Sequence, residues 1–579
     1  MGETDLAGRR RGRGPRRQLD AFRPLAGNRA LLRVVAAYAL FIVTEYSVWV
    51  AMLVFAYHRG GATVAGLIAV AQLVPAAVLA PVVAALADRR SPVVLLAGGY
   101  LVQAAAMAAT AAGVASGQPA AAYVAAVIAS TAVTTTRPAQ STLIPSVSVT
   151  PDQLTAANVV VGWMEAAGTA LAGLLVGVLI AAAGVASVFA VCAGLGLVAC
   201  ALVARLRVAA HGQSRGSGEA LGSGEGLARD PEGSPAPEPV PGVLGGLGEG
   251  LRLAAGQPRL RLMLALLTAE AVVVGAFDLL FVILAVGVLS RPQAWAGYLN
   301  FVYGAGAVVA ATMSAMLVGR RLGPPILVAG LLTSGALAVL AVGPGLGGTI
   351  ALLALAGASH AVMDVASRTL LQRSVPSKLT GRIFGVLEGL TMAGLAVGSL
   401  LVPVLVALGG STLALAGVAA VLPLAAVAGG RALFRLDTGA AVPVVEIALL
   451  RSLPLFAELP APAIEGLAAA LVQVDVRAGD VLIRQGDPGE TYYAIASGEL
   501  DVAADGHFLR RCGRGEGVGE IALLHDVPRT ATVTAHTAAT VYELRREPFL
   551  IAVLGHAATQ QAAGRISGAR LAASELAGS

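Results

Sequence analysis

The feature that most constrains this chain is a succession of long apolar segments between Leu31 and Leu433. Each segment is about as long as the roughly 20 apolar residues that cross a bilayer as an α-helix. Only 13% of the residues are charged, well below the roughly 25% of an ordinary soluble domain. We therefore expect a helical membrane protein surrounded by a lipid bilayer. Twelve spans are predicted, at 33–57, 63–86, 93–115, 120–142, 155–181, 184–204, 260–288, 294–318, 324–343, 348–371, 380–408 and 411–433.

The charges of the loops predict how the chain is inserted. Before residue 445 there are 29 basic residues, and only Arg59 and Arg291 follow odd-numbered spans. Such an excess of Arg and Lys is typical of the cytoplasmic loops of membrane proteins. Both chain ends are therefore expected in the cytoplasm, with the helices in the plasma membrane. The basic start has no short apolar core followed by a cleavage site, so no cleaved signal peptide is expected.

An internal repeat divides the apolar part into two halves. Arg89 recurs as Arg320 and Arg137 recurs as Arg368, both at an offset of 231 residues. These matches fall at equivalent places and predict two parallel six-helix halves, related by an axis along the membrane normal. Between the halves, residues 205–255 are rich in Gly, Ser, Pro and Glu. This composition predicts a flexible cytoplasmic linker.

The loop at 85–92 connects this pattern with a known family. It reads Ala-Leu-Ala-Asp-Arg-Arg-Ser-Pro, and Asp88 and Arg89 stand where the signature loop of the major facilitator superfamily has its Asp-Arg pair. With the two halves and the long linker, residues 20–435 resemble this superfamily. The Arg-Pro-Ala stretch at 137–139 resembles its siderophore and macrolide exporter branch. The resemblance implies a secondary active transporter that exports a small-molecule substrate.

Charged residues of the membrane part supply two sets of candidate transport residues. Asp88, Arg89 and Arg90 lie at a cytoplasmic helix end, where a charge pair can latch one helix bundle against another. The alternative is that these charges only set the topology. Carboxyl groups within the spans are costly unless they face water or a partner, so they are candidate cavity acids that carry a proton or meet a cationic group. The candidates are Glu45, Glu165, Glu270, Asp278 and Glu388, with Asp364 nearby.

Each candidate acid also has a simpler interpretation. It can be a protonated structural residue, or one that pairs with Ser or Thr. Arg137 and Arg368 are expected near cytoplasmic helix ends, where long basic side chains usually reach the membrane interface.

From about residue 445 the pattern changes to alternation. Apolar residues alternate with polar ones around Val474, Val481, Ile495, Val502 and Val541, separated by turn signals. This predicts several short antiparallel strands of a small β-roll. Helical segments are expected on both sides, at about 460–471 and 548–573. Residues 445–579 hold 11 Arg and 16 acidic residues, so this tail is acidic whereas the membrane part is basic.

One loop of the tail, at 518–532, carries recognisable chemistry. Gly519 allows the backbone to approach a ligand closely. Glu520 can accept hydrogen bonds from vicinal hydroxyl groups, and Arg529 offers a two-pronged donor for a phosphate. Together these groups suit a ribose joined to a phosphate.

The same loop resembles the phosphate-binding cassette of the cyclic nucleotide-binding domain, and the resemblance covers about 450–560. It implies that Glu520 takes the ribose 2′-hydroxyl and Arg529 the cyclic phosphate. The expected nucleotide site is Gly519, Glu520, Ile521, Ala522, Arg529 and Thr530. cAMP is the favoured ligand, and cGMP is the alternative because Thr530 can reach a guanine amino group. A degenerate copy without a ligand is the other interpretation. The resemblance also implies that a last helix, beginning near Phe549, closes over the pocket.

Composition and motifs exclude several other functions. The basic excess lies in the apolar part, so a membrane explains it better than nucleic acid does. The sequence has no Gly-Lys phosphate loop, no Ser or Cys with a catalytic His, and no Cys/His zinc spacing, so we expect neither an enzyme nor a metal site. His507, His525 and His536 are expected at the surface. A cyclic nucleotide-gated channel is excluded because no pore loop is present.

Two functions remain: a transporter regulated by the nucleotide, and a membrane-anchored nucleotide receptor that no longer transports. The predicted organisation is a basic N-terminus at 1–30, helices at 31–204, a linker at 205–255, helices at 256–435, a nucleotide-binding domain at 445–560 and a C-terminal helix or tail at 561–579.

Overall fold

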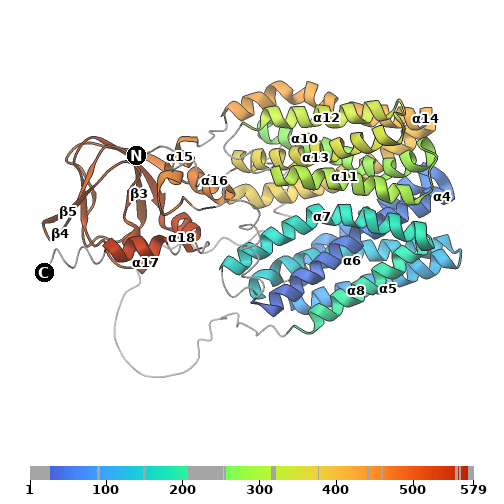
Figure 1. The fold of residues 1–579 in the computed structure, drawn as a ribbon, viewed down its shortest axis with the longest axis horizontal. Helices are drawn as coiled ribbons and strands as arrows, with labels where there is room; N and C mark the ends of the chain where they lie inside the picture. Colours follow the sequence, from blue (N-terminus) through green and yellow to red (C-terminus); the bar gives the residue numbers. More distant parts are fainter. Residues whose placement is uncertain are drawn as a thin grey trace, which may run out of the picture.

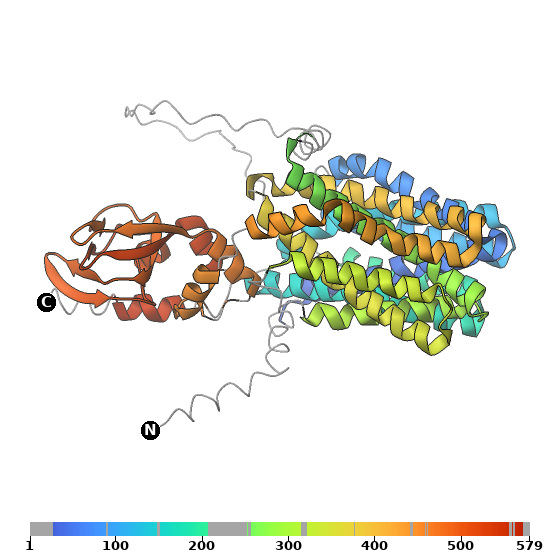
Figure 2. The same cartoon turned by 90° about the horizontal axis from the view of Figure 1, so that it is seen from above.

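The computed structural model places a bundle of long helices beside a smaller β-rich domain (Figure 1). The β-rich domain is the C-terminal tail, and both views place it at one end of the helices (Figure 2). The structure describes residues 27–87, 91–147, 151–206, 252, 256–313, 321–375, 377–439, 444–457, 459, 461–554, 559 and 562–570. The predicted loop residues Asp88, Arg89 and Arg90, and nearly all of the predicted linker, lie outside these ranges.

The bundle is built from the apolar segments identified in the sequence. Helix is the expected form because a backbone in a bilayer must satisfy its own hydrogen bonds, and because Ala and Leu, which dominate here, favour helix. The helices are α4 (Arg29–Ala87), α5 (Pro92–Ala115), α6 (Pro119–Val147), α7 (Pro151–Ala183), α8 (Val185–Ala204), α10 (Pro258–Val282), α11 (Ala294–Met313), α12 (Gly323–Leu340), α13 (Gly345–Ser374) and α14 (Ser377–Gly439). A π-helical turn, η1 (Ile283–Val288), extends α10.

Two of these helices, α4 and α14, each cover two predicted spans. α4 and α14 each contain a Gly-Gly break, at Gly60–Gly61 and Gly409–Gly410. Gly61 has φ of +64° and Gly410 has φ of +73°, and this left-handed conformation favours glycine. The breaks fall where the sequence predicts a loop between two spans. Helix is therefore present at every predicted span.

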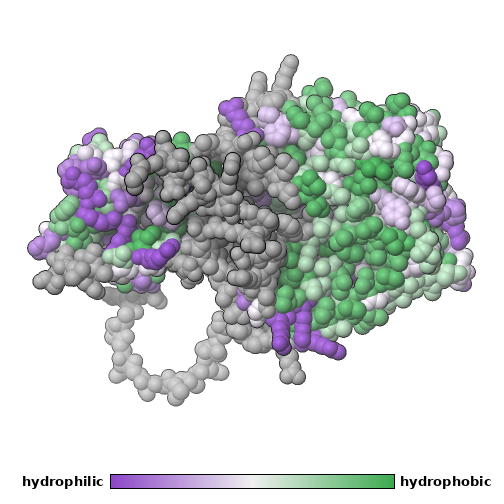
Figure 3. All heavy atoms as spheres, viewed as in Figure 1, coloured by the Kyte–Doolittle hydropathy of each residue, from purple (hydrophilic) through white to green (hydrophobic). Residues whose placement is uncertain are grey.

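The surface of the bundle fits a bilayer. Hydrophobic side chains cover most of the face shown in Figure 3, whereas the described part of the tail is more hydrophilic. Among the described residues, eight helices are long and apolar enough to cross a membrane, and shorter apolar helices lie at 119–134 and 167–183. The helical membrane fold is thus confirmed, and the number of twelve crossings remains a prediction.

The two halves of the bundle meet through small residues. α7 of the first half packs against α11 of the second half (Figure 1). A Cβ atom on Gly173 would lie 2.5 Å from the backbone nitrogen of Phe301, and one on Gly304 would lie 2.8 Å from the Cα of Ala170. Because these distances are too short for any side chain, glycine allows the two backbones to approach closely.

The tail is a β-roll of two antiparallel four-stranded sheets with helices packed at one end. One sheet has the order β1-β8-β3-β6 and the other has the order β2-β7-β4-β5. The strands are β1 (Val472–Val476), β2 (Val481–Ile483), β3 (Thr491–Ser497), β4 (Leu500–Ala504), β5 (His507–Cys512), β6 (Gly517–Val518), β7 (Thr532–Ala535) and β8 (Ala539–Arg545). The helices are α15 (Val444–Ser452), α16 (Ala461–Ala469), α17 (Glu520–His525) and α18 (Arg546–Leu554), and residues 562–570 form a further helix.

Two hydrophobic clusters hold the tail together. One lies between the sheets and includes Ile495, Val502 and Val541, which are residues of the predicted alternation. The other joins the helices to β3 and β8 through Phe456, Tyr492 and Phe549. The predicted antiparallel β-roll is therefore confirmed, and the sequence analysis missed strands β5, β6 and β7 and helix α15.

Candidate functional site

A cavity of about 380 Å³ lies against the predicted nucleotide loop of the tail. Its walls come from both sheets, from α17 and from the helix at 562–570. All six residues of the predicted nucleotide site line it, so the fold brings them together. The lining residues are Ile483, Val502, Phe508, Leu509, Arg510, Val518, Gly519, Glu520, Ile521, Ala522, Arg529, Thr530, Ala531, Val533, Ala569 and Arg570.

Arg529 supplies a buried positive charge in this cavity. It is only 6% exposed, and its guanidinium donates hydrogen bonds to the carbonyl oxygen of Gly519 at 3.0 Å and to that of Thr491 at 2.7 Å. Among the described residues, no carboxylate lies within ion-pair distance of it. Burial lowers the pKa of Arg529 below its ordinary value, although an arginine stays charged at neutral pH. The same guanidinium also donates a hydrogen bond to the hydroxyl oxygen of Thr491 at 3.1 Å. A buried cation that is held by neutral acceptors is suited to an anionic ligand.

Glu520 supplies an acceptor on the same wall. It is 2% exposed, and its Oε1 accepts a hydrogen bond from Arg570 at 2.5 Å. Among the described residues, its Oε2 has no hydrogen-bond partner. A buried carboxylate oxygen without a partner is costly, so a hydroxyl group of a ligand would satisfy it.

Gly519 precedes Glu520 in the chain and contacts Arg529, so its backbone conformation determines where both side chains lie. Its φ is +94°, and a Cβ atom there would lie 2.6 Å from a guanidinium nitrogen of Arg529. Only glycine fits this position without displacing the arginine. The backbone at Gly519 therefore places Glu520 at the start of α17 while its carbonyl holds Arg529.

The cavity walls offer an anion site and a hydroxyl-binding site side by side, between apolar side chains from the sheets. Their chemistry fits a ligand that contains a sugar hydroxyl and a phosphate, with an apolar surface for a base. The sequence analysis missed Arg570, because its place opposite Glu520 depends on the path of the chain after α18. The residues around Arg570 in the sequence form no motif that would place its guanidinium at the cavity.

The end of the tail is helical at the described residues of the range predicted at 548–573. Among the described residues, α18 covers Arg546–Leu554 and residues 562–570 are helical. Phe549 is fully buried, and its ring packs against those of Tyr492 and Phe456 with centroids 5.0 and 6.0 Å apart. These contacts fix α18 to the sheet. In this part of the chain, the helical residues that reach the cavity are Ala569 and Arg570, at the end of the stretch 562–570.

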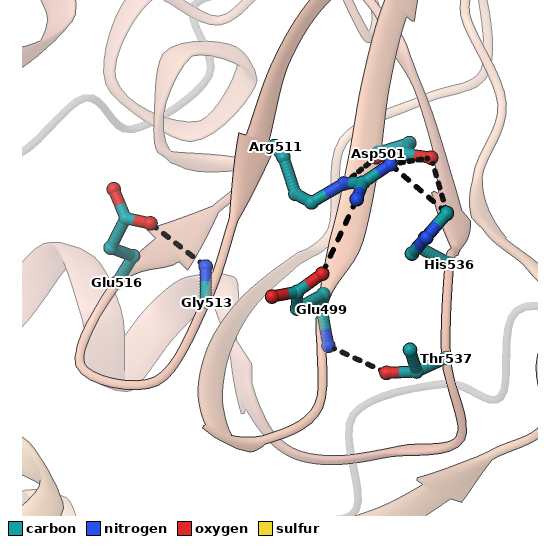
Figure 4. A network of polar contacts seen from close by, with 7 residues as sticks. All are labelled: Glu499, Asp501, Arg511, Gly513, Glu516, His536 and Thr537. Carbon is teal, nitrogen blue, oxygen red and sulfur yellow. Dashed lines mark hydrogen bonds and ion pairs between the residues drawn. The ribbon is translucent and has the colours of Figure 1, made fainter.

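A second polar network lies on the outer side of β4 and β5 (Figure 4). Arg511 donates hydrogen bonds to Asp501 at 2.7 Å and to Glu499 at 3.4 Å, and His536 lies 3.0 Å from Asp501. Arg511 holds the pKa of the Asp501 carboxyl below its ordinary value. Arg510 lines the cavity but Arg511 does not, so this network is separate from the candidate site.

In the first half of the bundle, three of the predicted residues form one charge cluster. Arg137 lies 3.0 Å from Glu45 and 3.4 Å from Glu165, and the hydroxyl of Tyr38 donates a hydrogen bond to Glu165 at 2.5 Å. The two acids, from α4 and α7, pair with an Arg137 side chain that is 44% exposed, and its expected place at the membrane interface remains a prediction.

In the second half, the predicted acids have separate surroundings. Glu270 lies 3.1 Å from His360, and Asp364 pairs with Arg368 one helical turn later at 2.6 Å. Glu388 is exposed in the structure.

Asp278 links the two halves of the bundle. The indole nitrogen of Trp49, on α4 in the first half, donates a hydrogen bond to the Asp278 carboxylate at 3.0 Å. The sequence analysis did not identify Trp49 or His360, since neither position carries a motif.

Comparison with known families agrees with both parts of the chain. A family model described as Major Facilitator Superfamily matches residues 34–387. The chain belongs to the Major Facilitator Superfamily. A second model, described as Cyclic nucleotide-binding domain, matches residues 473–554. This superfamily protein therefore carries a cyclic nucleotide-binding domain after its membrane part.

Two fungal proteins are each similar to a stretch of about 100 residues of this superfamily protein. It is 36% identical to a cAMP-dependent protein kinase regulatory subunit of Emericella nidulans over 104 residues, which are 18% of this chain and 25% of that protein. It is 41% identical to the corresponding subunit of Eremothecium gossypii over 101 residues, which are 17% of this chain and 22% of that protein. The chain thus covers about a quarter of these relatives.

One solved structure, the regulatory domain of Toxoplasma gondii PKA with cAMP, is also similar to this chain. It has 34% identity and a TM-score of 0.19, and the match covers 20% of this chain and 46% of that one.

Proposed function

We propose that this protein exports a small molecule across the plasma membrane by secondary active transport, and that a cyclic nucleotide bound to its cytoplasmic tail controls the rate. The observation that carries this proposal is the pairing of Arg529 and Glu520 in one cavity of a chain that also holds a transporter domain. The two groups offer a cation and an acceptor where a cyclic nucleotide has a phosphate and a ribose.

In this proposal Arg529 binds the cyclic phosphate and the free Oε2 of Glu520 accepts the ribose 2′-hydroxyl. Gly519, Ile521 and Ala522 form the backbone wall beside them, and Thr530 faces the base. cAMP is the favoured ligand, because the fungal relatives of the tail are named as cAMP-dependent. cGMP is the alternative that the hydroxyl of Thr530 permits.

The loop charges support an orientation with both termini in the cytoplasm, and the resemblance of residues 137–139 supports export. Asp88, Arg89 and Arg90 are proposed as the gate loop. The acids of the membrane part are proposed to meet the substrate or a coupling proton. The tail begins at α15, directly after the last helix of the bundle, so a change in the tail can reach the ends of the membrane helices.

Calorimetry on the purified full-length protein tests the nucleotide site. We expect binding of cAMP to the wild type and a loss of at least tenfold in affinity for Arg529→Ala, because a hydrogen bond to a charged group contributes about 1.5–3 kcal/mol. Arg545→Ala is the matched control, since Arg545 is an exposed arginine outside the cavity. Equal affinity of Arg529→Ala and the wild type would contradict the site, and tighter binding of cGMP would reverse the choice of ligand.

A further inference from the structure

Two arginines follow odd-numbered predicted spans, and both have an unusual setting. Arg59 follows the first span and Arg291 follows the seventh, so they lie at corresponding places of the two halves. Both residues are exposed, and hydrophilic side chains gather at the end of the bundle away from the tail (Figure 3). Each guanidinium nevertheless lies over an aromatic ring, which a charge that only sets the topology does not need.

The first of these settings is at the end of the first predicted span. The guanidinium carbon of Arg59 lies 5.1 Å from the centroid of the Phe55 ring, four residues earlier on α4. That ring is 6% exposed and packs at a steep angle against the ring of Tyr123 on α6, with centroids 5.8 Å apart. The bundle therefore fixes the ring, and the attraction between a cation and a ring face holds Arg59 on it.

The second setting is the turn before α11. The guanidinium carbon of Arg291 lies 5.6 Å from the centroid of the Trp295 ring, four residues later. Ser290 has φ of +49°, and the backbone nitrogen of Arg291 donates a hydrogen bond to the carbonyl oxygen of Ala285 at 2.8 Å, so the turn is tightly held. The Trp295 ring packs edge-on against that of Tyr298, 5.7 Å away, and Tyr298 lies against α7. This setting therefore borders the contact between the two halves.

Stacking leaves the N–H groups at the edge of each guanidinium available. Among the described residues, neither Arg59 nor Arg291 makes an ion pair or a side-chain hydrogen bond. Residues 46–87 and 279–313 contain no Asp and no Glu, so no carboxylate nearby in the chain competes for these donors. A planar fork of free donors matches two oxygens of a phosphate group.

The depth of the two arginines indicates that this phosphate belongs to a lipid. Each lies at the end of an apolar span, where the polar headgroups of the bilayer begin. Tryptophan and tyrosine are enriched at this depth, and a long basic side chain reaches the headgroups from here. Since no acid balances either guanidinium, a lipid of net negative charge fits better than a zwitterionic one.

We propose that Arg59 on Phe55 and Arg291 on Trp295 are two binding sites for the phosphate group of an anionic phospholipid, in the leaflet away from the tail. The arginines bind the phosphate, and the two rings are positioning residues. Because the second site borders the contact between α7 and α11, a lipid bound there also stabilises this contact. The inference goes beyond the proposed function, since it rests on the membrane fold and involves neither the nucleotide nor export.

Native mass spectrometry of the full-length protein tests both sites. The protein is released from detergent micelles that contain phosphatidylglycerol, and the lipid molecules retained on each protein are counted. We expect one retained lipid fewer in Arg59→Gln and in Arg291→Gln, and two fewer in the double variant. Arg545→Gln is the matched control, since Arg545 is an exposed arginine of the tail, and it should retain as many lipids as the wild type.

Two further variants test the role of the ring. Trp295→Leu should lower the retention of lipid at the second site several-fold, because Arg291 keeps its charge but loses the surface that positions it. Trp295→Phe keeps a ring and should retain the lipid. Equal retention in Trp295→Leu and the wild type would contradict the positioning role.

Three results would overturn the proposal. One is an unchanged number of lipids in the double variant. Another is equal retention of phosphatidylcholine, because the sites would then not recognise a net negative charge. The third is displacement of the lipid by millimolar inorganic phosphate, which would make these sites for a soluble anion. Each of these results leaves the proposed transport function intact.

Discussion

Arg570 donates a hydrogen bond to Oε1 of Glu520 at 2.5 Å, and the same guanidinium nitrogen donates another to the carbonyl oxygen of Gly517 at 2.9 Å. The last helix of the described chain is therefore attached to the wall of the candidate nucleotide site. Because Oε1 of Glu520 accepts the hydrogen bond of Arg570, Oε2 remains available to accept a hydrogen bond from the ligand. Arg570 thus orients the carboxylate and keeps the helix at 562–570 against the cavity.

Arg570→Ala should weaken nucleotide binding about tenfold, because a charged hydrogen bond of about 1.5–3 kcal/mol is lost and a buried carboxylate loses its partner. Arg570→Lys should restore part of the affinity, since lysine keeps the charge but has a single donor group in place of a fork. Titration of the full-length protein with a fluorescent cAMP analogue measures both. Unchanged or tighter binding in Arg570→Ala would show that the arginine blocks the site instead of supporting it.

Gly519→Ala should destabilise the tail and abolish nucleotide binding. Alanine at a φ of +94° is strained, at a cost of about 1–3 kcal/mol, and its Cβ displaces Arg529. Gly513→Ala is the control, because no atom lies within 4 Å of a Cβ atom there. Calorimetric unfolding with and without cAMP measures the two variants. A Gly519→Ala protein that binds normally would contradict the described backbone geometry.

The Asp501–Arg511 contact should stabilise the tail only above acidic pH. Arg511 lowers the pKa of Asp501 in the folded protein, whereas the unfolded value is about 3.9. The contact therefore stabilises the folded tail at pH values above the unfolded pKa of Asp501. This stabilisation is lost as the pH falls through the lower pKa that Asp501 has in the folded protein. The difference in the tail's Tm between wild type and Asp501→Asn should shrink as the pH is lowered from about 5 to about 3. It should also shrink with added salt, since both groups are exposed. A difference that grows on acidification would contradict this sign.

Gly304→Ala should weaken the contact between the halves of the bundle. Its Cβ would lie 2.8 Å from backbone atoms of Ala170, and overpacking of this kind costs about 1–3 kcal/mol. Gly335→Ala, at a position with no atom within 4 Å, should leave the thermal stability in detergent unchanged. Equal unfolding temperatures of the two variants would show that α7 and α11 are not closely packed.

The helices and strands could be predicted from the sequence where the pattern of apolar residues within a short window determines them. Apolar runs of the length of a span and the alternation around Val502 and Val541 are signals that short windows contain, and the helices and sheets follow them. The conformational demand at Gly519 was also visible, because the loop that contains it matches a known cassette.

Contacts between distant segments were not visible in the same way. Arg570 lies 50 residues from Glu520 along the chain, and His360 lies three helices from Glu270 in sequence order. The pairing of Arg137 was not predicted for the same reason, since its partners Glu45 and Glu165 come from two other helices. Such pairs depend on packing, and a single sequence carries no signal for packing over this distance.

The central claim, that the nucleotide controls transport, is tested most directly by transport in proteoliposomes. A substrate is first found by screening cationic and amphiphilic compounds, and its transport rate is then measured with and without cAMP on the side of the tail. We predict a several-fold change for the wild type, which corresponds to a coupling of about 1–3 kcal/mol, and no change for Arg529→Ala, whereas Arg545→Ala should behave as the wild type. A wild-type protein that binds cAMP yet transports at the same rate with and without it would contradict this account and favour a receptor that no longer uses its transporter part.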